Sequence, residues 1–285
     1  MLNLKVEEDD VFRLDVYLAE KLGEPRRVVQ SLIKSHQILV NGVAVKSSYK
    51  PKTLDSITVN LPQKENGFPE ERLPDLDLIY EDQDIIVLNK VSGVVVHPND
   101  VQKNGTLLDA LLQYFPDLSS VGEFPRHGIV HRLDKDTSGL MVIAKTYDAF
   151  EHLKMQFKNR TVDKRYVAVV QGNIQTDSFM IDQPLKRHAR KRYMYTVSPD
   201  GKDAQTEVNV IKRYNSKTIV EAKPITGRTH QIRVHLSFYG NPILGDPLYH
   251  NSSNEQGQLL QAYFLSFFHP KTQTKLSFSL NKLYL

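Results

Sequence analysis

The sequence of 285 residues has no cysteine and no long apolar run. Without cysteine, disulfide bonds, thiolate nucleophiles, iron–sulfur clusters and cysteine-based zinc sites are excluded, so only histidines and carboxylates remain as possible metal ligands. No apolar run reaches the roughly 18 residues that a membrane-spanning helix needs. The first ten residues are acidic, whereas a signal peptide begins basic and then becomes apolar. These absences predict a soluble, cytoplasmic protein.

The composition is that of a globular protein with a modest preference for polyanions. Apolar residues make up 40% of the chain, the formal net charge is +4 and the sequence pI is about 9.0. The length suits one large domain with a small appendage. Many basic proteins never bind nucleic acid, so the net charge alone does not indicate such a partner. The position of the charges along the chain is the better evidence.

Residues 11–61 combine two short helical patterns with a small sheet. Ile38–Val40 followed by Asn41-Gly42 predicts a hairpin, because a type I′ turn needs two residues that tolerate positive φ. Seven basic residues and one acidic residue fall within residues 21–52, which indicates a polyanion-binding surface. The order Arg-Leu-Asp-x-Tyr-Leu, Arg-Arg and Val-Asn-Gly resembles an S4-type RNA-binding domain. This resemblance and the basic charge predict RNA contacts by Arg26, Arg27, Lys34 and Lys46.

The remainder of the chain is expected to be a linker and one larger domain. Residues 62–73 are polar and turn-rich, which is typical of a linker. From residue 74 to residue 285, strands and helices mix without βαβ alternation. That order predicts an α+β domain with a mainly antiparallel sheet flanked by helices. The expected strands are 85–88, 94–96, 140–144, 166–170, 218–222 and 260–268, and the expected helices are 107–115, 149–157 and 229–239.

A carboxylate between two cations stands just before an apolar strand. Asp134 lies between Arg132 and Lys135 in the run His-Arg-Leu-Asp-Lys-Asp-Thr-Ser-Gly-Leu at residues 131–140. The neighbouring positive charges would stabilise its ionised form, which makes it a candidate nucleophile or base. An ordinary Asp/Ser/Gly turn before a core strand would have the same composition. The run alone leaves both interpretations open.

Three further runs carry reactive or recognition residues. Residues 164–172 alternate like a half-buried strand and place Tyr166 among cations. In residues 223–236, Thr-Gly is followed by Arg228 and Arg233, which offer cationic donors to a phosphate or carboxylate at the start of a helix. The fourth run is Asn-Lys-Val-Ser-Gly-Val-Val-Val-His-Pro at residues 89–98.

Together, these four runs resemble the motifs of the large pseudouridine synthase family that modifies ribosomal and transfer RNA. The resemblance implies the pseudouridine synthase fold, an isomerisation without a cofactor, and Asp134 as the catalytic residue. It implies that Tyr166 stacks on the target base and that Arg233 pairs with the catalytic carboxylate. It leaves open whether Asp134 forms a covalent adduct or draws a proton from the sugar to give a glycal. The expected substrate-binding residues are Arg132, Arg228, His131 and Lys164.

A second dense basic run, at residues 186–192, is suited to backbone phosphates. The predicted partner is RNA, and the S4-like segment favours ribosomal RNA over transfer RNA. No zipper or other oligomer signal is present, so a monomer is expected. The residues predicted to contact phosphate are Lys186, Arg187, Arg190, Lys191 and Arg192.

Other classes of protein fit the sequence less well. The histidines at 127, 131, 230 and 235 lack zinc or facial-triad spacing, so no metal is expected. Ser138-Gly139 lacks the Gly-x-Ser-x-Gly elbow of hydrolases. A non-catalytic RNA-binding assembly factor is the main alternative. It predicts the loss of Asp134, Tyr166 or Arg233, and all three are present.

Overall fold

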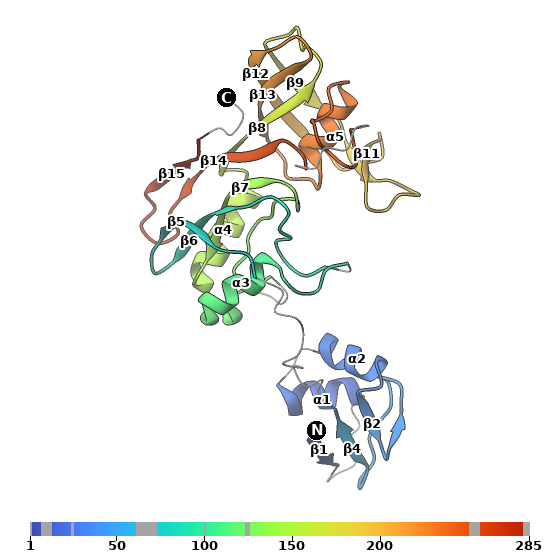
Figure 1. Ribbon diagram of the computed structural model, residues 1–285. Helices are drawn as coiled ribbons and strands as arrows, with labels where there is room; N and C mark the ends of the chain where they lie inside the picture. The colour runs from blue at the N-terminus through green and yellow to red at the C-terminus, as the bar shows by residue number, and fades with distance from the viewer. Residues whose placement is uncertain are drawn as a thin grey trace. The chain divides into compact units, whose positions relative to one another are not determined.

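The computed structural model describes residues 2–6, 13–23, 26–60, 73–99, 101–122, 126–250 and 257–281 (Figure 1), without the side chains of residues 27, 28 and 31. The chain divides into two compact units, Met1–Glu70 and Glu71–Leu285. The expected linker at 62–73 lies outside the described residues except for residue 73, and so does the side chain of Arg27. No helix in the described ranges is both long and apolar enough to cross a membrane.

The N-terminal unit packs two helices on a small antiparallel sheet. Asn41 and Gly42 have φ angles of 51° and 78° between paired Val40 and Val43, which confirms the predicted hairpin turn. Leu14 and Leu18 are buried against the sheet. The helices are α1 (Leu14–Leu22) and α2 (Arg26–Lys34), and the strands, in the order β1-β4-β2-β3, are β1 (Leu2–Lys5), β4 (Ser56–Val59), β2 (Ile38–Val40) and β3 (Val43–Ala44).

A buried carboxylate ties the two helices of this unit together. Asp15, fully buried on α1, accepts hydrogen bonds from Arg13, Arg26 and Gln30. Burial alone would raise the pKa of Asp15, but the donors from Gln30, Arg13 and Arg26 lower it to about 2. Arg26 is therefore already engaged within the unit, although half of its side chain is exposed.

A large mixed sheet forms the centre of the C-terminal unit. Strands β14 and β7 pair in parallel, and the other paired strands are antiparallel, so the described sheet confirms the predicted α+β class. In spatial order the strands are β5 (Asp77–Glu81), β6 (Ile85–Lys90), β7 (Ser138–Ala144), β14 (Leu260–Phe268), β8 (Asp163–Gln171), β13 (Lys217–Pro224), β12 (Gln205–Arg213) and β9 (Ser178–Asp182), with β15 (Lys275–Ser279) paired to β14.

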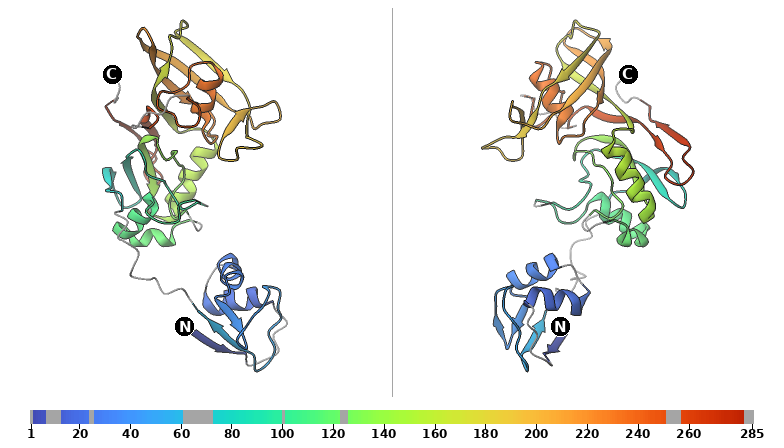
Figure 2. Two further views of the ribbon diagram at one scale, coloured as in Figure 1. Left: turned by 45° about the vertical axis from the view of Figure 1, so that its right-hand side comes forward. Right: turned by 180° about the vertical axis from the view of Figure 1, so that it is seen from behind.

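Helices cover the two halves of this sheet separately, as Figures 1 and 2 show. One hydrophobic core joins β6 and β7 to α3 (Leu107–Tyr114), η1 (Pro116–Ser120) and α4 (Tyr147–Lys158). A second core joins β8, β12 and β13 to α5 (Gln231–Phe238). A separate hairpin of β10 (Leu185–Arg187) and β11 (Tyr195–Val197) lies beside α5. The two halves of the sheet thus have separate hydrophobic cores, and polar residues can lie between them.

The expected strand at 94–96 is wrong. The carbonyl oxygens of Val95 and Val96 accept the backbone N–H groups of Leu107 and Leu108 at the start of α3. The carbonyl oxygen of Val94 accepts from the buried ammonium group of Lys90. Because these acceptors are used by a helix terminus and a side chain, no ladder forms here.

Candidate active site

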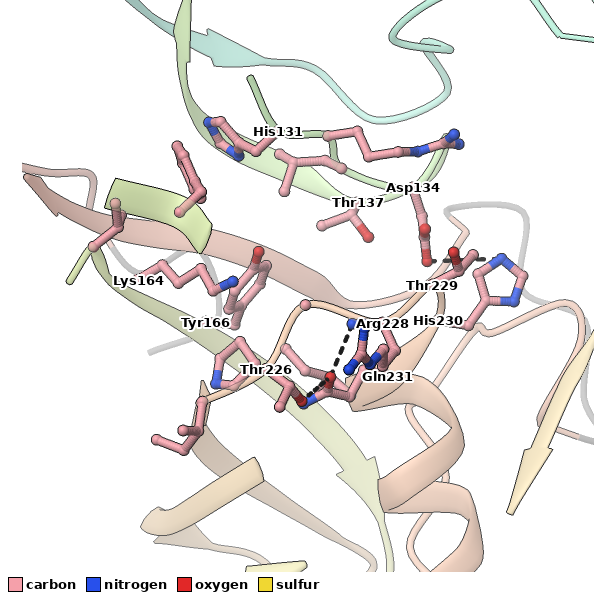
Figure 3. A pocket seen from close by; sticks show the side chains of 18 of the residues that line it. His131, Asp134, Thr137, Lys164, Tyr166, Thr226, Arg228, Thr229, His230 and Gln231 are labelled. Carbon is pink, nitrogen blue, oxygen red and sulfur yellow. Dashed lines mark hydrogen bonds and ion pairs between the residues drawn. The ribbon is translucent and has the colours of Figure 1, made fainter. Parts of the chain in front are cut away.

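A cavity of about 550 Å³ opens where three segments meet between the two hydrophobic cores (Figure 3). The loop before β7 supplies Asp134, and strand β8 supplies Lys164 and Tyr166. The N-cap of α5 supplies His230, and the first turn of that helix supplies Arg233. These are ionisable side chains from parts of the sequence that are far apart. The cavity is therefore the strongest candidate for a reactive site.

The loop that carries Asp134 is held on both sides. On one side, the buried Lys90 ammonium donates to the carbonyl oxygens of Val91, Val94 and Lys135 at 2.8–2.9 Å. On the other side, Nε2 of His131 accepts the backbone N–H of Val142 at 3.0 Å. These anchors fix the backbone on both sides of the carboxylate.

Burial changes the proton affinity of both anchors. It lowers the pKa of Lys90 to about 8, although the nearby Asp136 and Asp134 carboxylates oppose this, so Lys90 remains a cation at neutral pH. Burial also lowers the pKa of His131 to about 3, with a smaller contribution from Lys164. Its ring, stacked on Phe157 at 4.5 Å between centroids, is therefore neutral and can accept the Val142 hydrogen bond.

Arg233 connects Asp134 to a second, fully buried carboxylate. Its Nε and Nη2 donate to Oδ2 and Oδ1 of Asp246 at 2.7 and 2.9 Å, and its Nη1 donates to Oδ2 of Asp134 at 2.9 Å. Burial alone would lower the pKa of Arg233, but the bonds to Asp246 and the charge of Asp134 keep it above its usual range. A bidentate pair fixes the guanidinium plane, so Asp246 directs the third nitrogen at Asp134.

Lys164 and Tyr166 form the opposite wall (Figure 3). Residues two apart in a strand share one face, which is why both side chains point into the cavity. Burial raises the pKa of Tyr166, and the charge of Asp134 adds to the effect, so the phenol stays protonated. Burial lowers the pKa of Lys164, and no hydrogen bond joins its ammonium to another described residue. The wall thus offers an aromatic face and an available donor.

Two family models match the chain. Residues 84–238 match the model described as RNA pseudouridylate synthase, and residues 12–57 match the S4 domain. The chain belongs to the RNA pseudouridylate synthase family. The predicted family and its N-terminal S4 domain are both confirmed, and the protein is an RNA pseudouridine synthase.

Similar proteins cover nearly the whole synthase. An uncharacterized RNA pseudouridine synthase of Bacillus subtilis is 43% identical over 275 residues, which are 95% of this chain and 91% of that protein. Ribosomal large subunit pseudouridine synthase D of Escherichia coli K12 is 40% identical over 240 residues, 83% and 72% of the two chains. The solved structure of human RNA pseudouridylate synthase domain containing 1 superposes with a TM-score of 0.61 at 27% identity, covering 74% of this chain and 85% of that one.

The cation beside Asp134 is Arg233, the arginine that the resemblance implied, and not one of its neighbours in the sequence. Arg132 and Lys135 are exposed, and the described cation in hydrogen-bond contact with Asp134 is Arg233. Arg228 has another partner, because its Nε donates to the carbonyl oxygen of Asp203. Arg132 and Lys135 form no hydrogen bond or ion pair with Asp134 in the described part of the chain. Substrate contacts by Arg132, Arg228, His131 and Lys164 stay predictions, and all four residues line the cavity.

The predicted phosphate-binding residues are only partly available. In the β10–β11 hairpin, Arg190, Lys191 and Arg192 are exposed at the turn. Lys186 forms an ion pair with Asp200 at 2.7 Å, and Arg187 lies over the ring of Tyr195 at 5.7 Å. In the N-terminal unit, Lys34 and Lys46 are exposed.

Sequence reasoning missed three residues that organise the site. Asp246 anchors Arg233, Gln231 bonds to Thr226 and to the backbone N–H of Arg228, and Tyr249 contacts both Arg233 and His230. Asp246 lies beyond the run at residues 223–236 that contains Arg228 and Arg233. Its buried carboxylate is thirteen residues after Arg233, and that separation carried no signal by itself.

One further group of potential metal ligands lies apart from the cavity. Ligand atoms of Asp82, Asp84 and His269 lie within 4.8 Å of one another. The Asp82 carboxylate already accepts from Tyr80, His269 and the backbone N–H groups of Asp84 and Ile85. These hydrogen bonds explain why the three residues lie together: they stabilise the β5–β6 turn.

Proposed function

We propose that Asp134 is the reactive carboxylate and that uridines in large-subunit ribosomal RNA are the substrate. One observation carries the first part: Oδ2 of Asp134 is occupied by Arg233, whereas Oδ1 has no hydrogen-bond partner among the described residues and belongs to the cavity that Tyr166 lines. The names of several relatives, ribosomal large subunit pseudouridine synthase D, support the second part.

The reaction requires no outside reagent. The N1–C1′ bond of uridine breaks, the uracil turns, and a C5–C1′ bond forms, while the C5 hydrogen leaves as a proton and N1 gains one. Cleavage develops positive charge on the sugar, which a nearby carboxylate stabilises or traps. Alternatively, Asp134 takes a sugar proton to give a glycal. Because no electrons enter or leave, we propose that the enzyme works without metal or cofactor.

The proposed binding mode follows from the cavity walls. A uridine in folded RNA must be flipped out of its stack to reach Asp134. The aromatic face of Tyr166 would stack on the uracil, as aromatic side chains do on unstacked bases in RNA recognition. Lys164 would donate to a uracil carbonyl oxygen, because its ammonium has no partner in the described structure. Arg132, exposed beside the nucleophile, would contact a phosphate.

The proposed RNA contacts outside the cavity are electrostatic. Arg190, Lys191 and Arg192 at the hairpin turn would bind backbone phosphates, together with Arg187 and Lys186 after its release from Asp200. In the S4 domain, we assign the same role to Arg26, Lys34 and Lys46. We further propose a monomeric enzyme that acts in the cytoplasm, where ribosomal RNA is found.

Pseudouridine mapping in cells tests this proposal. Carbodiimide-based mapping of ribosomal and transfer RNA would compare cells with the intact gene, a deletion, and the Asp134→Asn form. We expect the same ribosomal sites to vanish in both altered strains, with RNA binding by the purified variant unchanged. Loss of sites in transfer RNA alone would overturn the ribosomal assignment. Sites that persist with Asp134→Asn but vanish in the deletion would overturn the role of Asp134.

A further inference from the structure

A histidine without a role in the proposed reaction lies close to the reactive carboxylate. His230 lies directly before α5, and its Nε2 is 3.9 Å from Oδ2 of Asp134 (Figure 3). Its φ angle is 58°, in the left-handed region that side-chain-bearing residues rarely occupy. Such an outlier at a reactive site favours a functional reason for the placement of the side chain.

Two tyrosines confine the imidazole ring. The rings of Tyr195 and Tyr249 lie edge-on to it, with centroids at 5.6 and 5.7 Å. Tyr249 also lies against the guanidinium of Arg233, with the ring centroid 5.2 Å from Cζ. His230 therefore belongs to the same packed group that directs Arg233 at Asp134.

The hydrogen bonds of Tyr249 favour one of the two ring nitrogens of His230 as the carrier of the proton. Its hydroxyl oxygen accepts the backbone N–H of Tyr195 at 2.8 Å and lies 2.9 Å from Nδ1 of His230. No other acceptor for this hydroxyl is found among the described residues, which favours donation of its hydrogen to Nδ1. A neutral imidazole that accepts at Nδ1 carries its hydrogen on Nε2. Burial keeps the pKa of His230 below 6.5, although Asp134 opposes this, so the ring is neutral at pH 7.

We infer that His230 is a positioning residue: its Nε2–H, kept on that nitrogen by the Tyr249 hydroxyl, donates to Oδ2 of Asp134 and leaves Oδ1 for the substrate. This inference rests on the proposed role of Asp134. The separation of 3.9 Å is longer than a hydrogen bond. Contacts of catalytic groups commonly shorten when substrate binds, and here Arg233 and His230 would then hold the same oxygen. With its hydrogen on Nε2, the ring would face Asp134 with a donor and not with a base.

Two substitutions of His230 test the roles of its two ring nitrogens one at a time. His230→Asn retains a polar group near the Nδ1 position, so it can bond to Tyr249, and asparagine tolerates the left-handed backbone. It removes the donor to Asp134. His230→Gln places an amide nitrogen near the Nε2 position and restores that donor. Tyr249→Phe keeps the aromatic ring on Arg233 but removes the hydroxyl, so either ring nitrogen of His230 can carry the proton. Its matched control is Tyr214→Phe, at the exposed β12–β13 turn.

The measurement is single-turnover release of tritium from RNA that carries [5-³H]uridine, with RNA affinity determined in parallel. We expect His230→Asn to slow turnover by roughly tenfold at unchanged RNA affinity, as for the loss of one hydrogen bond to a charged group. His230→Gln should recover most of the rate, Tyr249→Phe should be slowed, and Tyr214→Phe should match the unsubstituted enzyme. A wild-type rate in His230→Asn, or equal losses in His230→Asn and His230→Gln, would overturn the inference.

Nitrogen-15 spectra of the histidine side chains test the tautomer directly. We expect the Nε2–H form of His230 in the unsubstituted protein, and a proton on Nδ1 would overturn the assignment. Asp134→Asn serves as the reference for the proposed function. If it retains full activity, the role of Asp134 fails; if it is inactive while His230→Asn turns over normally, only the role of His230 fails.

Discussion

Nη1 of Arg233 lies 2.9 Å from Oδ2 of Asp134, a contact between residues 99 positions apart in the sequence. The geometry of this pair depends on Asp246, which holds the other two guanidinium nitrogens from a position with no exposed side-chain surface. The reactive carboxylate is therefore oriented by a chain of three charged groups. Changes at the far end of the chain should reach the reaction.

Asp246→Asn should impair both folding and turnover. It removes the charge that compensates Arg233, and breaking a buried ion pair in this way costs about 3–5 kcal/mol. We expect hydrogen–deuterium exchange in α5 to show a loss of that order, and turnover to fall more steeply than RNA affinity. The control is Asp177→Asn, which breaks an ion pair with Arg213 whose carboxylate is 89% exposed, and should change stability by less than about 1 kcal/mol. Equal stability of the two variants would contradict this account.

His131 should make the C-terminal unit lose stability as the pH falls. Its pKa is about 3 in the folded protein and 6.5 when unfolded, so between these values the unfolded chain binds more protons. The contribution of the neutral His131 ring to the free energy of unfolding is complete above pH 6.5. It is lost as the pH falls toward 3, by up to about 1.4 kcal/mol per pH unit. His131→Gln keeps an acceptor for Val142 without titrating. Hydrogen exchange in β7 would be measured in both proteins at pH 7, 6 and 5. We expect the unsubstituted protein to lose stability relative to His131→Gln as the pH falls.

Gly139→Ala should destabilise the sheet where β7 meets β14. A Cβ atom at this position would lie 2.2 Å from the carbonyl oxygen of Ala262, and the φ angle is 120°. We expect a loss of at least about 2 kcal/mol, measured by thermal unfolding of the C-terminal unit. Gly240→Ala is the control, because its φ is 96° with nothing within 4 Å of the added atom. Similar losses in both variants would show that backbone strain, not the contact with β14, decides the effect.

Neutralising the hairpin turn should weaken RNA binding without slowing the chemical step. Replacing Arg190, Lys191 and Arg192 by alanine should reduce the slope of log affinity against log salt by about 0.7–0.9 for each phosphate that the variant no longer binds. Filter binding at several salt concentrations measures the slope, and single-turnover rates at saturating enzyme should stay unchanged. Lys271→Ala with Lys275→Ala, near the β14–β15 turn, removes charge elsewhere as a control. An unchanged slope in the hairpin variant would exclude these phosphate-binding roles.

Contiguous motifs were enough to predict the family, the S4 domain and the hairpin at Asn41-Gly42. Each of these depends on residues close together in the chain, where spacing and backbone preference act directly. The same reasoning was wrong at 94–96, because apolar β-branched residues fit both a strand and an irregular segment packed beside the start of a helix. Only the tertiary contacts with Leu107, Leu108 and Lys90 decide between them.

The sequence by itself determined which residue types the site would contain: a carboxylate at 134, an aromatic ring at 166 and arginines at 228 and 233. The motif resemblance implied the pairing of Arg233 with the carboxylate, and tertiary structure decided how that pair is held. Arg132 and Lys135 are the cations closest to Asp134 in the sequence, but side chains of a surface loop gain more from hydration than from an exposed ion pair. The buried Asp246 selects Arg233 instead, and it confers on Asp134 one occupied and one available oxygen. Such a choice depends on burial and on distances across the fold, which the order of residues does not contain.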